Sequence, residues 1–344
     1  MTVQAQSHPS GSVPEQALTW YRDGGAVLAT VIRTWGSAPR PVGSQAAIGA
    51  SGALAGSVSG GCVEGAIIAE ASGVIETGEP RIFEFGVSDD DAFAVGLACG
   101  GQISVMVEPV GSPPGLSVAI LEQLIACREA RQPVALLTNT RTWERRVLER
   151  SEHQSETGQD EPAADLHAHL RSDSSTREGD WFVHVFSPPL RLMIVGAVHI
   201  AQPLVTMAEL CGYEVTVIDP REMFATRERF PDVAIHTEWP DDVLSVLQPD
   251  SRTALVTLTH DPKIDDAALL CGLGTDLFYI GSLGSRRTHA RRLERLRQCG
   301  ADNNALQRIH APIGLDIGAA TPAEIALAVL AEITHTLRHG DDDG

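Results

Sequence analysis

The stretch that decides the fold of this 344-residue chain opens its second half: Leu192-Met193-Ile194-Val195-Gly196-Ala197-Val198-His199-Ile200-Ala201. Its four leading apolar residues predict a short buried strand, and the glycine after them predicts a turn into a helix. Strand and helix patterns alternate from there onward, which is typical of a parallel sheet with helices on both faces. Further strands are expected at residues 214–218, 233–235, 253–259 and 277–280.

The turn after this first strand is where a doubly wound sheet carries a dinucleotide-binding glycine fingerprint. Gly196 and His199 lie in that turn, and Asp219 closes the second strand, where an acid suits the ribose hydroxyls of a dinucleotide. Arg221 follows closely and suits a 2′-phosphate. Val198, however, stands where the fingerprint has the glycine that lets the backbone approach the pyrophosphate. The sequence therefore predicts a Rossmann-like fold and leaves NAD(P) binding open.

Two later loops are expected at the same edge of this sheet, where strands end and helices begin. The first is Thr259-His260-Asp261, and the second is Gly281-Ser282-Leu283-Gly284-Ser285-Arg286-Arg287, which opens a helix. Amides at a helix N-terminus and arginine side chains favour an anionic partner. The candidate cofactor-binding residues of these loops are Thr259, His260, Asp261, Gly281, Ser285, Arg286 and Arg287. Farther along the same helix, a solvated face is expected for Arg291, Arg292 and Arg295.

Two glycine-rich stretches in the first half each hold one cysteine: Gly60-Gly61-Cys62 within residues 56–65, and Cys99-Gly100-Gly101 within residues 96–101. Glycine beside a reactive side chain permits positive φ and close backbone approach, and successive bare amides form a nest for an anion. A helical pattern follows Cys62, so we expect its thiol near a helix N-terminus, where a thiolate is favoured. Glu64 opposes this by placing a negative charge in the first turn.

Cys62 and Cys99 are therefore candidate catalytic nucleophiles or soft metal ligands. The competing interpretation is that both are small buried apolar residues, as unpaired cysteines often are. The sequence has no Cys-x-x-Cys and no His-Glu-x-x-His pattern, and so carries no zinc signature.

Length and the change of pattern predict two domains, an α+β domain over residues 14–187 and the Rossmann-like domain over residues 190–340. Pro188-Pro189 marks the linker between them. Residues 149–179 are polar and charged, and we expect them to form a flexible insert in the first domain. The predicted fold class is α/β, with a doubly wound parallel sheet preceded by an α+β unit.

The chain is acidic, with a formal net charge of −19, which argues against nucleic acid as its main partner. No apolar run approaches the roughly 20 residues that span a bilayer, so no membrane span is expected. The first 13 residues lack the basic cluster and apolar core of a secretory signal. Six scattered cysteines are typical of reduced thiols, and together these features predict a cytoplasmic protein.

The motifs of both halves resemble those of the XdhC/CoxI family, the accessory proteins of xanthine dehydrogenase and related molybdenum hydroxylases. In the first half the resemblance rests on residues 36–40 (Gly-Ser-Ala-Pro-Arg), residues 59–64 and residues 96–101. In the second half it rests on residues 217–221, 259–261, 279–287 and 309–318. The family usually has Gly-Ala-Gly-His where this chain has Gly196-Ala197-Val198-His199.

This resemblance implies a chaperone that binds the molybdenum cofactor, a molybdopterin, and protects it. It implies that a cysteine desulfurase supplies the terminal sulfur and that the loaded cofactor passes to an apo-hydroxylase of the xanthine dehydrogenase type. Cys62 first and Cys99 second are then the expected molybdenum ligands or sulfur carriers, since a thiolate is a soft ligand. The pterin phosphate suits the amides of four glycines: Gly60, Gly61, Gly100 and Gly101. We also expect a homodimer.

Two other functions remain open from the sequence. The first is an NAD(P)-dependent oxidoreductase with a thiol-containing substrate domain, although the chain has no Tyr-x-x-x-Lys pattern and Lys263 is its only lysine. The second is an interaction scaffold whose Rossmann half only dimerises. We favour a non-enzymatic maturation factor over both.

Overall fold

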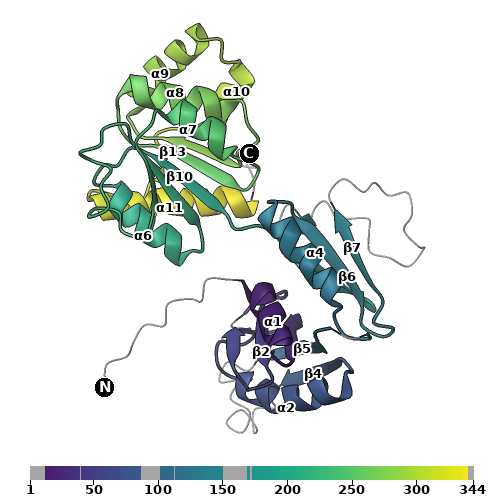
Figure 1. Ribbon diagram of the computed structural model, residues 1–344. Coiled ribbons are helices and arrows are strands. Elements are labelled where there is room, and N and C mark those ends of the chain that lie inside the picture. The colour runs from purple at the N-terminus through teal and green to yellow at the C-terminus, as the bar shows by residue number, and fades with distance from the viewer. Residues whose placement is uncertain are drawn as a thin grey trace. The chain divides into compact units, whose positions relative to one another are not determined.

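Figure 1 shows the computed structural model, which describes residues 12–38, 40–86, 101–111, 113–149, 169–170 and 173–339. The chain divides into two compact units, residues 1–188 and residues 189–344, and each is described by itself. Cys99, Gly100 and most of the insert expected over residues 149–179 lie outside the described residues. In the described part of the chain, every helix is too short or too polar to span a bilayer.

The first unit contains an antiparallel sheet with the strand order β3-β2-β1-β5-β4. Its strands are β1 (Ala26–Trp35), β2 (Gln45–Gly49), β3 (Leu54–Gly56), β4 (Arg81–Gly86) and β5 (Gln102–Pro109). Helix α2 (Glu64–Thr77) covers one face and helix α1 (Val13–Arg22) covers the other. Helix α4 (Val118–Glu129) packs beside α1 in the same core. Alternate side chains of β1 enter these two cores, with Val27 and Ala29 on the α2 side and Ala26 and Leu28 opposite.

Several connections leave this sheet from one end, because its neighbouring strands are antiparallel. β1 ends there at Trp35, which pairs with Gln102 at the start of β5. β4 also ends there at Gly86, again opposite Gln102. β3 ends at Gly56 beside Ala46, and the chain continues from it through Cys62 into α2. Residues 36–38, the Cys62 loop and the described residues that border segment 87–100 therefore share one end of the sheet.

A second antiparallel sheet in the first unit has the order β7-β6-β9-β8. Its strands are β6 (Val134–Asn139), β7 (Arg145–Glu149), β8 (Thr176–Glu178) and β9 (Trp181–Phe186). A buried ion pair joins the two sheets, with Arg145 Nη2 3.0 Å from Glu108 Oε2. The predicted flexible insert is wrong at residues 176–178, which form β8. β8 is an edge strand that pairs with one neighbour, so it does not need apolar side chains on both faces. Its polar sequence therefore gives no strand pattern.

The second unit is built on a parallel sheet with the order β12-β11-β10-β13-β14-β15 within residues 173–339. Its strands are β10 (Arg191–Val195), β11 (Glu214–Ile218), β12 (Ala234–His236), β13 (Thr253–Thr257), β14 (Tyr279–Ser282) and β15 (Ile309–His310). The helices are α6 (Ala201–Leu210), α7 (Pro240–Leu247), α8 (Pro262–Leu273), α9 (Arg286–Gln298), α10 (Asn303–Gln307) and α11 (Pro322–His339). This confirms the predicted doubly wound α/β fold. The strand order reverses between β10 and β13, so the turns after these two strands are neighbours.

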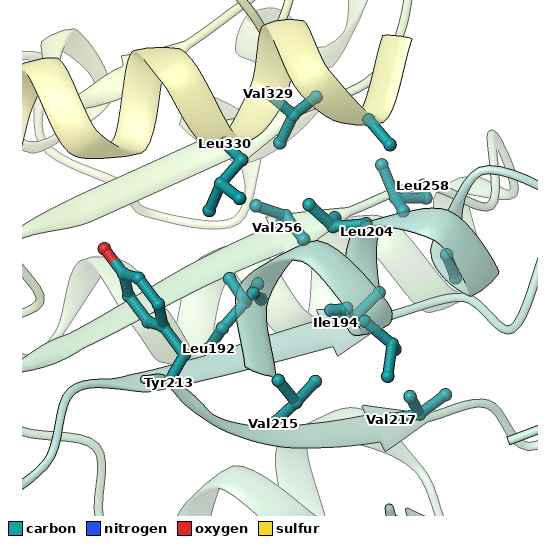
Figure 2. Packing of buried hydrophobic residues seen from close by; sticks show 14 of the residues in the cluster. Leu192, Ile194, Leu204, Tyr213, Val215, Val217, Val256, Leu258, Val329 and Leu330 are labelled. Carbon is teal, nitrogen blue, oxygen red and sulfur yellow. The ribbon is translucent and has the colours of Figure 1, made fainter. Parts of the chain in front are cut away.

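Helices cover both faces of the parallel sheet (Figure 1). On one face, α6 and α11 bring Leu204 and Leu330 against strand residues such as Leu192 and Ile194 (Figure 2). On the other face, α7, α8 and α9 pack over Met193 and the neighbouring strand residues. Because both faces of β10 are buried, its sequence is apolar without interruption instead of alternating.

Candidate functional site

Cys62 lies in the loop that joins β3 to α2, two residues before the helix begins at Glu64. Its side chain is half-buried and packs against the core cluster that includes Val63 and Ile67. The predicted place near a helix N-terminus is confirmed. That the thiol binds a metal or acts as a nucleophile stays a prediction.

Glycines surround this thiol on both sides. Gly60 and Gly61 have φ values of +74° and +116°, in the left-handed region that favours glycine. A Cβ atom built on Gly61 or on Gly65 would meet no described heavy atom within 4 Å. All three glycines are exposed. Among the described residues, the backbone on both sides of Cys62 is therefore exposed and carries no side chain at these three positions.

The amides of this loop are not bare, and the expectation of an open anion nest at Gly60 and Gly61 is corrected here. Glu64 Oε1 accepts hydrogen bonds from Ser57 Oγ at 2.7 Å, from the Val58 amide at 3.1 Å and from the Ser59 amide at 2.9 Å. Glu64 Oε2 accepts from the Gly61 amide at 2.9 Å and from Ser59 Oγ. The Gly60 amide donates to Ser57 Oγ at 2.8 Å.

The Glu64 carboxylate thus takes the place in which a ligand's anion was expected. Burial raises the pKa of this carboxyl, but hydrogen bonds from Ser59 and Ser57 outweigh burial and lower the pKa to about 2. The group is therefore ionised throughout the physiological pH range. The carboxylate points into the loop, where hydrogen-bond donors stabilise its negative charge.

Gly101, the last residue of the second cysteine stretch, has a packing role. It is buried at the start of β5, and a Cβ on it would lie 2.6 Å from the Ser37 carbonyl oxygen and 3.0 Å from that of Trp35. Only glycine allows this approach of two backbone segments. Its predicted contact with a cofactor phosphate stays a prediction, and Cys99 and Gly100 lie outside the described residues.

In the second unit, Asp219 is fully buried, which corrects its predicted role at ribose hydroxyls. Its Oδ2 accepts from the Ala197 amide at 2.8 Å, and both oxygens accept from the Arg221 guanidinium, at 2.9 Å from Nε and 2.8 Å from Nη2. Burial raises the pKa of Asp219, but the hydrogen bonds from Arg221 and Ala197 lower it overall. Arg221 likewise faces Asp219 and not a 2′-phosphate.

These contacts test whether the turn after β10 fits a dinucleotide. The amide of Ala197 is occupied by Asp219, and Val198 packs its side chain against the core on the α6 face. Gly196, at φ +114°, approaches the turn after β13 so closely that a Cβ would lie 2.7 Å from Thr259 Cγ2. The residues present do not fit a pyrophosphate bound at this turn.

The loop Thr259-His260-Asp261 is also held by an internal carboxylate. Asp265 Oδ1 accepts from Thr259 Oγ1 at 2.7 Å, and Asp265 Oδ2 accepts from the His260 amide at 3.0 Å. Asp261 caps α8 by accepting from the Lys263 amide at 3.0 Å. His260 is exposed and adopts a positive φ of +64°. Of the three predicted residues, His260 alone is exposed, and Thr259 and Asp261 make internal bonds.

The loop over residues 281–287 divides into a buried and an exposed part. Gly281 is buried, and a Cβ on it would lie 2.5 Å from Ile313 Cδ1. Ser285 caps α9 by accepting from the Thr288 amide at 3.2 Å. Arg286 and Arg287 are exposed in the first turn of α9, as the anion-site prediction requires.

Arg292, on the same helix, contradicts the predicted solvated face because it is only 2% exposed. Its Nη2 donates to the Leu283 carbonyl oxygen at 2.9 Å and lies 3.9 Å from Asp265 Oδ2. Among the described residues, its Nε and Nη1 have no hydrogen-bond partner. Through Asp265, which binds the loop after β13, and through the Leu283 carbonyl oxygen in the loop after β14, the Arg292 side chain connects these two loops.

The predicted site residues form two groups, one in each unit. Gly60, Gly61 and Cys62 lie together in the first unit. In the second unit the carboxyl edge of the sheet gathers the turns that carry Gly196, His199, Asp219, Arg221, Thr259, His260, Asp261, Ser285, Arg286 and Arg287. His199 is exposed at the start of α6.

Sequence reasoning missed Asp265 and misjudged both Arg292 and Glu64. One signal for Glu64 was available, because it stands three residues after Gly61, the spacing at which an acid reaches back to an amide in a capping box. Asp265 stands in the first turn of a helix, where acids are frequent on any solvated helix. Nothing in the sequence distinguishes Arg292 from the exposed arginines around it.

Comparison with known proteins gives two family matches along the chain. Residues 20–86 match the model described as the XdhC and CoxI family, and residues 192–333 match the one described as the XdhC Rossmann domain. The first match includes the Cys62 loop, and the second includes the whole carboxyl edge of the parallel sheet.

Individual proteins are similar over nearly the whole chain. The molybdenum cofactor insertion chaperone PaoD of Escherichia coli is 31% identical over 93% of this chain and 86% of its own length. A probable xanthine dehydrogenase subunit of Bacillus subtilis is 28% identical over 90% of this chain and 93% of its own. A crystal structure described as a xanthine dehydrogenase from Bacillus halodurans superposes with a TM-score of 0.72 at 27% identity, covering 96% of this chain and 97% of that one.

Proposed function

Because this chain belongs to the XdhC/CoxI family, we propose that it binds the molybdenum cofactor as cargo and delivers it to an apo-hydroxylase of the xanthine dehydrogenase type. The similarity to a molybdenum cofactor insertion chaperone over 93% of the chain supports this role. The observation that carries the proposal is the half-buried Cys62, flanked on both sides by exposed glycines. A thiolate in that position suits a soft metal.

In this proposal Cys62 contacts the molybdenum of the cargo or its terminal sulfur, and Cys99 supplies a second thiol. The support for Cys99 comes from its described neighbours. Gly86 and Gln102 pair with each other at the end of the sheet from which the Cys62 loop also departs. The pterin of the cargo would lie across Gly60 and Gly61.

We further propose that the cargo is sulfurated, that a cysteine desulfurase supplies this sulfur, and that the chain acts in the cytoplasm as a homodimer. The support for these points is the family resemblance of the two cysteine stretches, together with the six cysteines that the sequence scatters without a disulfide-type spacing.

The proposal assigns no NAD(P) chemistry to the second unit. Asp219 accepts hydrogen bonds from the Ala197 amide and, through both oxygens, from the Arg221 guanidinium. Because these groups are already paired within the chain, the oxidoreductase alternative is also disfavoured. Arg286 and Arg287 are exposed at that edge, and we propose that they form a separate site for an anion within the second unit.

Delivery is tested by mixing cofactor-loaded protein with a purified apo-hydroxylase under anaerobic conditions and following the activity of that enzyme. Wild-type protein should activate it, and a Cys62→Ala variant should not. Cys211→Ala, which removes an exposed thiol of the second unit, should match the wild type. Equal activation by the wild type and Cys62→Ala would contradict the role of the thiol, and no activation by the wild type would contradict the role in delivery.

A further inference from the structure

We infer that Glu64 is the positioning residue for Cys62: its carboxylate holds the cysteine loop from inside and stays in place when cargo binds. The inference deepens the proposed function and rests on it for the identity of the cargo. Glu64 touches no cargo in this account and acts only through the loop that it holds.

The Glu64 carboxylate is held by several strong hydrogen bonds. Five donors from Ser57, Val58, Ser59 and Gly61 converge on its two oxygens. Hydrogen bonds to an ionised carboxylate are roughly twice as strong as those between neutral groups. Glu64 is only 6% exposed, so little water competes for these donors.

The hydrogen bonds of Glu64 fix the residues on both sides of the Cys62 thiol. The Gly61 amide, directly before Cys62, donates to Glu64 Oε2 at 2.9 Å. The Val63 amide, directly after Cys62, donates to Ser59 Oγ at 2.9 Å, and that hydroxyl in turn donates to Glu64 Oε2. Both neighbours of Cys62 are thus tied to one carboxylate, which sets the direction of its Cα–Cβ bond.

Without these bonds the glycine-rich loop would have large backbone freedom. Gly60 and Gly61 adopt left-handed conformations and carry no side chain that packs against the core. Glycine has the largest backbone freedom of any residue, so a ligand held by such a loop bears the entropy of ordering it unless the loop is already ordered. The carboxylate of Glu64 provides that order before the cargo arrives.

A competing interpretation is that Glu64 is a temporary substitute for an anion of the cargo, which displaces it on binding. The buried position of the carboxylate argues against this, because a phosphate group reaches the same donors only after the loop has opened. The expected consequence is that the amides of this loop never hold the cargo's phosphate, so that the Cys62 loop contacts the cargo through its thiol and its exposed glycines.

The test compares Glu64→Gln with Glu70→Gln, which removes an exposed carboxylate from the same helix. A glutamine keeps the volume of the side chain but has one acceptor oxygen for donors that now meet two. Amide hydrogen exchange over residues 58–63 should become about tenfold faster in Glu64→Gln and stay unchanged in Glu70→Gln. Unchanged exchange in Glu64→Gln would overturn the inference whether or not the protein binds a cofactor.

The second measurement is retention of anaerobically isolated molybdenum cofactor by the folded variants. Glu64→Gln should retain it about tenfold less tightly, as expected when a group that orients a ligand is lost, and Glu64→Asp should recover part of the loss. Ser59→Ala, which cuts the link to Val63 but keeps the charge, should lower retention as well. It serves as the test if Glu64→Gln does not fold.

The outcomes separate the inference from the proposed function. If the wild type retains cofactor and Cys62→Ala loses it, but Glu64→Gln retains it fully, only the positioning role fails. If Glu64→Ala binds cofactor more tightly than the wild type, and inorganic phosphate competes with that binding, Glu64 is a displaceable substitute and the inference is overturned. If the wild type retains no cofactor, the proposed function fails, and hydrogen exchange alone decides the positioning of the loop.

Discussion

Replacing Asp219 by asparagine removes a buried charge without changing volume, at the point where the turn after β10 meets the end of β11. The carboxylate accepts from the amides of Ala197 and Arg221, at 2.8 and 3.0 Å, and twice from the Arg221 guanidinium. An asparagine keeps one acceptor oxygen and turns an NH₂ group toward the remaining donors. If the oxygen stays with the Arg221 amide and Nε, the Ala197 amide loses its acceptor.

The expected loss follows from these contacts. A hydrogen bond to a charged group contributes about 1.5–3 kcal/mol, and a buried amide without a partner costs about 1–3 kcal/mol. The Arg221 side chain is one-third exposed, so water offsets part of the loss of its partner. We expect the second unit to lose about 3 kcal/mol of unfolding free energy, which corresponds to a melting temperature lower by about 6–12 °C.

The assay is urea denaturation of wild-type protein, Asp219→Asn and the exposed-site control Asp276→Asn, followed by hydrogen exchange of peptides from the second unit. The loss should be full at pH 7 and shrink below about pH 3.8, because the pKa of Asp219 is lowered in the folded state and its stabilisation disappears as the carboxyl protonates. Equal midpoints for Asp219→Asn and the wild type, or tight binding of NADH by the wild type, would refute the assignment of Asp219 to internal bonding.

Three further predictions concern stability. Burial lowers the pKa of His184 to about 4, although its hydrogen bond to the Gly43 carbonyl oxygen opposes this. The first unit should therefore lose up to about 3 kcal/mol of unfolding free energy as the pH falls from 6.5 to 4. In urea titrations, His184→Gln should make the stability of this unit less dependent on pH. Arg292→Met leaves Asp265 buried without its arginine and should lower the unfolding free energy of the second unit, measured by urea denaturation, by about 3 kcal/mol. The exposed-site control Arg291→Met should leave it unchanged, and equal effects of the two substitutions would contradict the buried pairing. Gly65→Ala, in a helix with open space around the added Cβ, should stabilise the first unit by about 0.5–1 kcal/mol. Gly61→Ala, at φ +116°, should destabilise it by about 1–2 kcal/mol. Thermal melting of the two variants tests this, and a lower melting temperature for Gly65→Ala than for Gly61→Ala would disprove the loop conformation.

The architecture of the second unit could be predicted because its central strands lie between two cores. Leu192 and Ile194 enter one core while Met193 and Val195 enter the other, so burial leaves a continuous apolar run in the sequence. The same reasoning fails for β8, whose residues Thr176–Glu178 lie at the edge of a sheet and need no apolar face.

The positions of the site residues could be predicted better than their partners. Glycine next to cysteine, and an acid at the end of the second strand, mark turns correctly, because backbone conformation leaves a local trace in the sequence. What the sequence does not reveal is whether the acceptors and donors at those turns are already satisfied by the chain itself. Glu64 and Asp219 both accept hydrogen bonds from amides that a ligand was expected to use. Whether each side chain points toward those amides depends on the folded structure.

The central claim is that the Cys62 thiol binds the molybdenum cofactor as cargo, and its most direct test is the molybdenum retained per chain after anaerobic gel filtration. Wild-type protein incubated with isolated cofactor should carry molybdenum through the column. Cys62→Ala should elute without it while unfolding at the wild-type urea concentration, since the half-buried side chain is small. Full retention by a folded Cys62→Ala protein would contradict the claim.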